Sequence, residues 1–300
     1  MLDFRIYTFI EVCRHMNFTR AAESLAITQP TVSQHIRWLE REYDTQLFRY
    51  EGKKMYLTEA GQTILSVAAT MVHDEQFLRQ TVQNAGRRRQ LRLGATLTVG
   101  ETIIAGHVES YMKCHPEDRI TGEVGNTRKL TRMLDEGEID FALVEGYFEK
   151  KEYDYEIYSS ENYVCVCGPE LFHRLTDGGQ RKPKLADLHR ETLLVREEGS
   201  GTREILEKNL KERNYDVEDF SNLIQISNIH AIKTLAESGS GVTFLYRRAA
   251  EAELASGRLM ELPLKDFCVQ HEFALIWRKG SVFRDDYREF FKKELETEGA

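Results

Sequence analysis

A polar run between residues 29 and 37 carries the side-chain types that proteins use to read DNA. Val32 and Ile36 are spaced to face inward from one side of a helix, which leaves the polar groups on the other side. A glutamine amide such as Gln34 can bridge an adenine, and hydroxyl or guanidinium groups suit phosphate oxygens. The residues predicted to contact DNA from this run are Gln29, Pro30, Thr31, Ser33, Gln34, His35 and Arg37.

Two helices separated by a tight break must hold this run in place. Phe18, Ala21 and Leu25 fall on one face of a first helix. Thr28 is a predicted N-cap, and Pro30 suits the first turn of a second helix that continues to about residue 42. The pattern predicts a helix-turn-helix over about residues 18–37, and a motif kept only for packing is the alternative.

A basic hairpin is predicted directly after the second helix. Residues 48–57 form two short strand-like runs around Gly52, which can adopt the positive φ of a tight turn. Lys53 and Lys54 lie at the predicted tip, where they could reach a minor groove or its phosphates. The hairpin would therefore serve as a wing beside the recognition helix.

Residues 18–41, together with Leu47, Phe48 and residues 57–61, resemble the DNA-binding domain of the LysR-type transcriptional regulators. The rest of the chain resembles the effector-binding domain of that family more loosely. The resemblance implies a multidomain bacterial regulator, with a mainly α winged helix-turn-helix joined to an α/β, two-lobed domain like those of periplasmic binding proteins. It also implies double-stranded DNA as a partner, with RNA polymerase as a further candidate.

Two local features refine this resemblance. Residues 199–203 are most similar to the branch associated with sulfur assimilation and carbon fixation, whose effectors tend to be small anions or phosphorylated metabolites. Relatives usually carry arginine where this chain has Tyr50, and Arg49 stands immediately before it. Whether Arg49 replaces that arginine is left open by the sequence.

A long helix is predicted from Thr58, its N-cap, to Gly86. One face repeats at steps of three and four residues, which is coiled-coil spacing, through Ile64, Ala68, Met71, Glu75, Leu78 and Val82. This spacing favours a homodimer bound to a pseudo-palindromic operator, with a homotetramer through the effector domains, and packing within the same chain is the alternative.

The remaining sequence alternates between short apolar strands and amphipathic helices, which indicates parallel α/β structure. A strand at residues 91–95 is followed by a helix at residues 99–111, and a strand at 163–167 is expected to enter a second lobe. The predicted boundaries are 1–58 for the DNA-binding domain, 59–89 for the linker and 90–300 for the effector domain, with lobe I at 90–161 and 266–300 and lobe II at 162–265.

Hydroxyl groups and glycines at the starts of helices predict a small-molecule site between the lobes. Helix N-termini with nearby hydroxyls suit an anion or carboxylate, although ordinary helix capping would use the same residues. Glu101 and Glu145 would partly oppose an anion, so that a ligand with an amine or hydroxyl group stays open. The predicted effector residues are Thr96, Thr98, Asn126, Thr127, Gly199, Ser200, Gly201, Thr202, Ser227 and Asn228.

The charge of the chain is divided unevenly. Its 300 residues have a net charge of −8, made up of +2 in residues 1–90 and −10 in the remainder. A slightly basic head that is duplicated in a dimer is compatible with DNA binding that weakens steeply with salt. The sequence lacks an apolar run of membrane-spanning length and a signal-peptide pattern, so we expect a cytoplasmic protein with no membrane partner.

Enzymatic motifs are not evident. The five cysteines are scattered and odd in number, which argues against a disulfide framework, and Cys165 and Cys167 are expected to be buried rather than to bind metal. No cofactor is expected apart from the effector. A regulator whose C-terminal domain only mediates assembly is the runner-up, and a transport solute-binding protein is disfavoured by the helix-turn-helix.

Overall fold

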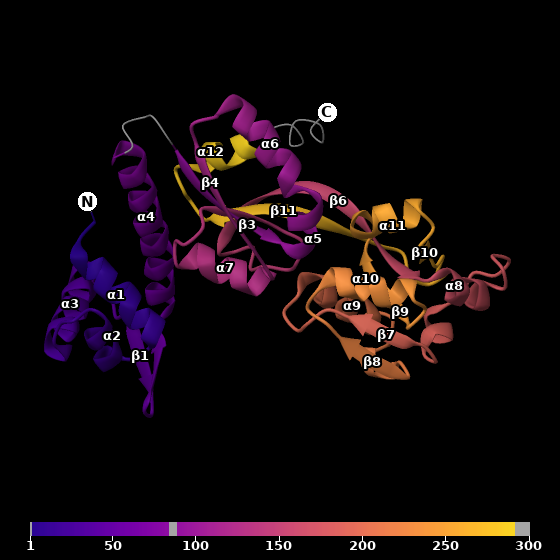
Figure 1. Ribbon diagram of the computed structural model, residues 1–300. Helices are drawn as coiled ribbons and strands as arrows, with labels where there is room; N and C mark the ends of the chain where they lie inside the picture. The colour runs from indigo at the N-terminus through magenta and orange to yellow at the C-terminus, as the bar shows by residue number, and fades with distance from the viewer. Residues whose placement is uncertain (1, 84–88, 292–300) are drawn as a thin grey trace.

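The computed structural model describes residues 2–83 and 89–291. Three helices and a hairpin form an N-terminal head (Figure 1). Asp3, Asn17 and Thr28 each accept backbone N–H bonds as N-caps, which explains where the three helices begin. The elements of the head are α1 (Phe4–His15), α2 (Phe18–Ser24), α3 (Gln29–Glu42), β1 (Phe48–Glu51) and β2 (Lys54–Leu57).

The helix α4 (Glu59–Gln83) stands between the head and the rest of the molecule (Figure 1). The Thr58 hydroxyl accepts a bond from the backbone N–H of Gly61 at 3.0 Å, as expected of an N-cap. A Cβ on Gly61 would lie 2.3 Å from the backbone oxygen of Leu47, so a glycine is needed where α4 crosses the head. No described helix is both long enough and apolar enough to cross a bilayer.

Both lobes share one continuous series of strands, in the order β4-β3-β5-β11-β6-β9-β7-β8, with β10 paired to β6. β3, β4 and β5 are parallel in lobe I, and β7, β8 and β9 are parallel in lobe II. The antiparallel pair of β6 and β11 runs through both lobes and joins them. The strands are β3 (Gln90–Thr96), β4 (Arg119–Gly125), β5 (Phe141–Val144), β6 (Tyr153–Cys167), β7 (Thr192–Val195), β8 (Asn222–Gln225), β9 (Val242–Tyr246), β10 (Met260–Glu261) and β11 (Val269–Arg278).

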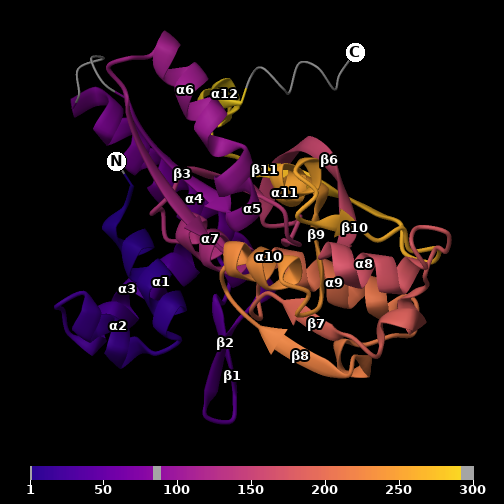
Figure 2. The same ribbon diagram turned by 45° about the vertical axis from the view of Figure 1, so that its right-hand side comes forward.

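Helices cover these strands in both lobes (Figure 2). Because parallel strands need crossover connections, helices follow most of them along the chain. In lobe I they are α5 (Leu97–Thr102), α6 (Ile104–Cys114), α7 (Thr127–Asp135) and α12 (Arg284–Phe290). In lobe II they are α8 (Pro169–Thr176), α9 (Gly201–Lys211), α10 (Ile229–Glu237) and α11 (Glu251–Ala255).

Two elements differ from the sequence prediction. The helix expected at residues 99–111 is divided into α5 and α6 at Ile103, within a run of β-branched side chains that fit a continuous helix poorly. The strand expected at residues 163–167 is the end of the much longer β6, in whose first half Tyr153 and Tyr158 are buried and the residues between them are partly or fully exposed. The sequence also predicts a closing helix over residues 283–295; α12 covers its first part to Phe290, and the end of the predicted helix lies outside the described residues.

Cys165 and Cys167 both point into the core of the effector domain. Burial raises the pKa of the Cys167 thiol to about 12, so this thiol is uncharged near neutral pH. Among the described residues, no group of three or more His, Cys, Asp or Glu side chains is arranged to hold a metal ion.

Candidate functional site

A groove of about 460 Å³ lies between α3 and the wing. Gln29, Ser33 and Arg37 project from one side of α3 and line this groove at successive helical turns. Tyr50 and Lys53 line it from the hairpin. The fold therefore brings four of the predicted DNA-contact residues, Gln29, Ser33, Arg37 and Lys53, onto one concave surface, which we call the recognition face.

The start of α3 is ordered by short-range hydrogen bonds. The Thr28 hydroxyl accepts from the backbone N–H of Thr31 at 3.3 Å and lies 2.8 Å from the Thr31 hydroxyl. The Gln29 amide donates to the Ser33 hydroxyl at 2.9 Å. These bonds restrict the polar side chains of the first turns before any ligand binds.

Three further predicted residues of α3 lie beside this face. Pro30 and Gln34 are exposed to solvent, as expected for residues that reach DNA. His35 differs, because its Nδ1 lies 2.9 Å from the Thr8 hydroxyl and its ring packs edge-on against Phe4 at 5.0 Å. His35 is therefore partly covered by α1, and its contact with DNA stays a prediction.

The wing has the geometry that its sequence predicts. Gly52 has a φ of +62°, and Glu51 faces Lys54 across the two strands. Neighbouring strand residues alternate between faces, so Arg49 lies opposite the groove, where its guanidinium packs over the Tyr56 ring at 5.2 Å. Arg49 therefore does not take the position of Tyr50, whose side chain is exposed at the groove.

The face of α4 that was predicted to form a coiled coil has two parts. Ala68 is buried in the core of the head, and Ile64 packs against that core. Met71, Leu78 and Val82 are at least half exposed. Packing within the same chain therefore accounts for the first part of the repeat, and the second part has an apolar surface open to solvent.

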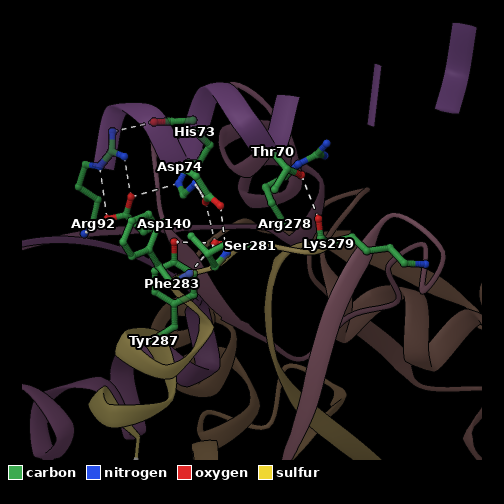
Figure 3. Close-up of polar contacts among 12 residues, drawn as sticks. Thr70, His73, Asp74, Arg92, Asp140, Arg278, Lys279, Ser281, Phe283 and Tyr287 are labelled. Carbon is green, nitrogen blue, oxygen red and sulfur yellow. Dashed lines mark hydrogen bonds and ion pairs between the residues drawn. The ribbon is translucent and has the colours of Figure 1, made fainter. Parts of the chain in front are cut away.

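The opposite face of α4 is fixed to lobe I by a buried polar cluster (Figure 3). His73 Nε2 lies 3.2 Å from an oxygen of Asp140, which also accepts bonds from the backbone and guanidinium of Arg92. Asp74 accepts bonds from the Ser281 hydroxyl at 2.7 Å and from the backbone N–H of Val282 at 3.0 Å. This cluster attaches the linker helix α4 to both chain segments of lobe I, through Asp140 in the first and through Ser281 and Val282 in the second.

The second site is where the two lobes meet. The side chains of Thr96, Thr98 and Thr127 from lobe I are buried there, as are those of Ser200 and Thr202 from lobe II. The hydroxyl oxygens of Thr96 and Thr127 have no hydrogen-bond partner in the described part of the chain. Buried hydroxyls without partners are costly, so they indicate a place for a polar ligand or for water. We call this set of five residues, with Glu145, the interlobe site.

Two glycines allow the lobes to approach this closely. A Cβ on Gly201 would lie 2.7 Å from the Cα of Gly146, and a Cβ on Gly146 would lie 2.3 Å from the Thr127 hydroxyl. Gly201 is the first residue of α9, so this contact places the positive end of an 11-residue helix at the interlobe site.

Glu145 lies at the centre of the interlobe site. It is fully buried, and one carboxylate oxygen accepts a bond from the Thr202 hydroxyl across the lobes at 2.8 Å. Burial raises the pKa of Glu145, against the opposing effects of the Thr98 and Thr202 hydroxyls and the positive charge of Arg196. The other carboxylate oxygen has no partner among the described residues.

Arg196 is a charged group that sequence reasoning missed. It follows β7 directly, is 3% exposed and pairs with Glu197 through Nε at 2.9 Å, while its Nη1 is buried without a partner in the described structure. Its position at the carboxyl end of a parallel strand, where ligands of open α/β sheets bind, was the available signal.

Four of the predicted effector residues lie elsewhere or already have partners. Asn126 and Asn228 cap α7 and α10 through their side-chain oxygens, which favours the capping alternative for both. Ser227 is exposed. Gly199 has a φ of +78°, which favours glycine in the turn before α9.

Comparisons with known proteins agree with this two-part organisation. Residues 84–292 match the family described as the LysR substrate binding domain, and residues 5–62 match the bacterial regulatory helix-turn-helix protein, lysR family. The chain is 29% identical over 295 residues to the RuBisCO operon transcriptional regulator of Allochromatium vinosum, covering 97% of this chain and 95% of that protein. It is 28% identical over 271 residues to the HTH-type transcriptional regulator CysL of Bacillus subtilis, covering 90% and 88%. The solved CcmR regulatory domain of Synechocystis PCC6803 in complex with 2-PG has a TM-score of 0.60 at 20% identity, covers 68% of this chain and 96% of that one, and shows the shared fold.

Proposed function

The chain belongs to the LysR family of bacterial transcription regulators, and we propose that it binds DNA as a homodimer and responds to a small anion held between its lobes. The recognition face supports the DNA part of this proposal. Gln29, Ser33 and Arg37 would enter a major groove on α3, while Lys53 and Lys54 of the wing would contact phosphates. Pro30, Thr31 and Gln34 would lie at the edge of that contact.

The exposed apolar surface of α4 supports a dimer. Val67, Met71, Leu78 and Val82 are each at least half exposed and recur at helical spacing along one side of α4. A second copy of α4 would cover them and place two recognition faces on one pseudo-palindromic operator. We propose a tetramer through effector domains, RNA polymerase as a partner and a cytoplasmic location on the resemblance to the family.

The interlobe site supports the effector part of the proposal. One observation carries it: the buried Nη1 of Arg196 and the buried hydroxyls of Thr96 and Thr127 have no hydrogen-bond partner among the residues that the structure describes. An anion there would accept bonds from these groups and from the helix N-terminus. CcmR, which shares the fold, was solved with 2-PG, and a related phosphorylated or carboxylated metabolite is the proposed ligand class.

Such a ligand would act by shifting the balance between lobe arrangements. It contacts both lobes, so it favours the closed arrangement by the difference between its affinities for the closed and open states. A change in lobe angle would alter how effector domains pack and how far apart the paired heads lie on DNA.

Calorimetry on the full chain with sulfate, inorganic phosphate and 2-PG tests the effector part. We expect binding by the wild type, a loss of at least tenfold in affinity for Thr202→Val, and no change for the exposed Thr234→Val. A footprint on the target promoter should change when the bound anion is added. Absence of heat with every anion would refute the anion site and leave the DNA-binding part standing.

One observation favours the runner-up, in which the C-terminal domain binds no effector and only mediates assembly. The Glu145 side chain already fills part of the space between the lobes and bonds to Thr202. If Glu145 is a permanent filler, no anion will bind and the footprint will be the same in every condition.

A further inference from the structure

A second cavity, of about 340 Å³, lies beside the interlobe site on the other side of Gly146. Its walls come from the segment between β5 and β6 and from the strands β6 and β11 that join the lobes. None of the threonines and serine of the interlobe site lines it. We call it the hinge pocket.

Aromatic rings form much of the hinge pocket. Tyr147, Phe148 and Tyr155 line it, and the rings of Phe148 and Tyr155 meet edge to face at 5.5 Å. The two tyrosines are 41% and 37% exposed, so part of each ring faces the cavity or solvent. The volume is at the lower end of the range for ligand pockets, roughly 300–1,000 Å³, and is far larger than an inorganic anion needs.

Two ammonium groups are held over these rings. Lys208 of α9 places Nζ 4.2 Å from the Tyr147 ring centre, and Lys150 places Nζ 4.8 Å from that of Tyr155. Among the described residues neither ammonium has a carboxylate within salt-bridge distance. In the lining itself, Lys150 and the exposed Glu272 carry opposite charges. Lys208 lies outside the lining, over the Tyr147 ring, and its charge gives the surroundings of the pocket a positive balance.

The positive charges of Lys208 and Lys150 affect His271, which lies in the wall of the hinge pocket. The ring of His271 meets that of Tyr147 at 5.2 Å. Burial and then the charges of Lys208 and Lys150 lower the pKa of His271 to about 4, so its ring is neutral near pH 7. His271 also contacts the Tyr246 hydroxyl at 3.2 Å, and Tyr246 donates to the backbone oxygen of Glu145 at 3.0 Å.

We propose that the hinge pocket is a second ligand site, which takes a small molecule that combines an aromatic or other flat apolar ring with an anionic group. The ring would lie against Tyr147, Phe148 and Tyr155, and the anion would pair with Lys150 and Lys208. Lys208 belongs to lobe II and Lys150 to the segment that leaves lobe I, so this ligand contacts both lobes. The ligand would also touch Gly146 and His271, and His271 is joined through the buried Tyr246 hydroxyl to the backbone of Glu145, so this ligand would act as a co-effector rather than as a competitor.

Phenyl phosphate, which has a ring and an anion, is a suitable probe for calorimetry on the full chain. Phenol supplies the ring alone and inorganic phosphate the anion alone. With inorganic phosphate in excess to fill the interlobe site, phenyl phosphate should still bind, at least tenfold more tightly than phenol.

Substitutions separate the two sites. The double variant K150Q/K208Q should lower the affinity for phenyl phosphate at least tenfold. Lys211→Gln should leave it unchanged, because Lys211 is on the same helix but has no cation–π contact with a ring of the pocket in the described part of the chain. Thr202→Val should also leave it unchanged. Both lysines are exposed, so equal melting temperatures should show that all variants fold.

Three results would overturn the proposal. Phenyl phosphate binding could be lost in Thr202→Val, which would place the ligand in the interlobe site. It could bind K150Q/K208Q as well as the wild type. Binding no tighter than that of phenol would show that the anion has no role. None of these results bears on the DNA-binding part or on the anion site proposed above.

Discussion

The recognition face and the interlobe site are built in opposite ways. The recognition face uses exposed or partly exposed side chains of α3 and of the hairpin that follows it, all between residues 29 and 53. The interlobe site uses buried side chains from residues 96 to 202, which only the folding of two lobes brings together. The first can contact a large partner as it stands, and the second must open before a ligand enters.

The largest effect expected from a single substitution is on the recognition face. Arg37→Ala should weaken operator binding by about 1–3 kcal/mol per head, or roughly tenfold or more, and two heads in a dimer double that energy. Arg41→Ala, on the same helix but outside the groove, should have little effect. Gel-shift titration measures both, and anion binding between the lobes should be unchanged. Equal losses for the two variants would show that α3 supplies only general positive charge.

More of the recognition face than of the interlobe site can be predicted from the sequence, because its residues are close together in the chain. Helical spacing around Thr28 fixes which side of α3 is polar, because the determinants are a few residues apart. It did not indicate that α1 partly covers His35, since the crossing of α1 is a tertiary contact that spacing does not encode.

The interlobe site depends on contacts between distant segments. The sequence indicated Thr98 and Thr202, which begin or precede helices, and also the carboxylate of Glu145. It did not indicate Arg196, and it could not separate ligand hydroxyls from the capping role that Asn126 proved to have. The hydrogen bonds of the folded chain distinguish the two, because the Asn126 oxygen has a backbone partner and the Thr96 hydroxyl has none among the described residues.

Adding one methyl group at Gly201 should disrupt the close packing of the two lobes. Gly201→Ala places a Cβ 2.7 Å from the Gly146 Cα, and a backbone neighbour cannot move aside as a flexible side chain can. We expect a loss of about 1–3 kcal/mol in closed-state stability and a fall of tenfold or more in sulfate affinity. Gly106→Ala, which has open space around its Cβ, is the control. Calorimetry that finds full sulfate affinity in Gly201→Ala would show that anion binding does not need this contact.

A smaller effect is expected from removing the internal carboxylate. Glu145→Gln removes a negative charge that opposes an anion, so sulfate affinity at pH 7 should rise by about tenfold, equivalent to about 1.4 kcal/mol. The pKa of Glu145 is raised, so sulfate binding by the wild type should strengthen as the pH falls toward that pKa. The variant should lose this dependence, while Glu149→Gln, in the same segment, should keep it. Weaker binding by Glu145→Gln would show instead that the ligand donates a bond to this carboxylate.

The smallest effect is expected at the polar cluster of His73, Asp74 and Asp140, which joins α4 to lobe I. Burial opposes the charging of His73, but its hydrogen bonds to Asp140 and Asp74 and their negative charges outweigh that cost and raise its pKa. A raised pKa means that the stabilising contribution is complete below the unfolded-state pKa of about 6.5 and is lost as the pH rises through the folded-state value. Thermal unfolding from pH 6 to 9 should therefore show a decrease of about 1 kcal/mol in wild-type stability that His73→Gln lacks.

The exposed His230→Gln serves as the control for this pH series, because it should retain the wild-type dependence. If His73→Gln has the same pH dependence as the wild type, the cluster does not titrate and acts only through packing. If this pH dependence is confirmed, the positive charge of His73 helps to hold α4 to lobe I, and this charge is lost as the pH rises above neutral. The head would then be attached to the interlobe site through Asp140 and the strands of lobe I, so that a change in lobe closure reaches the recognition face through this contact.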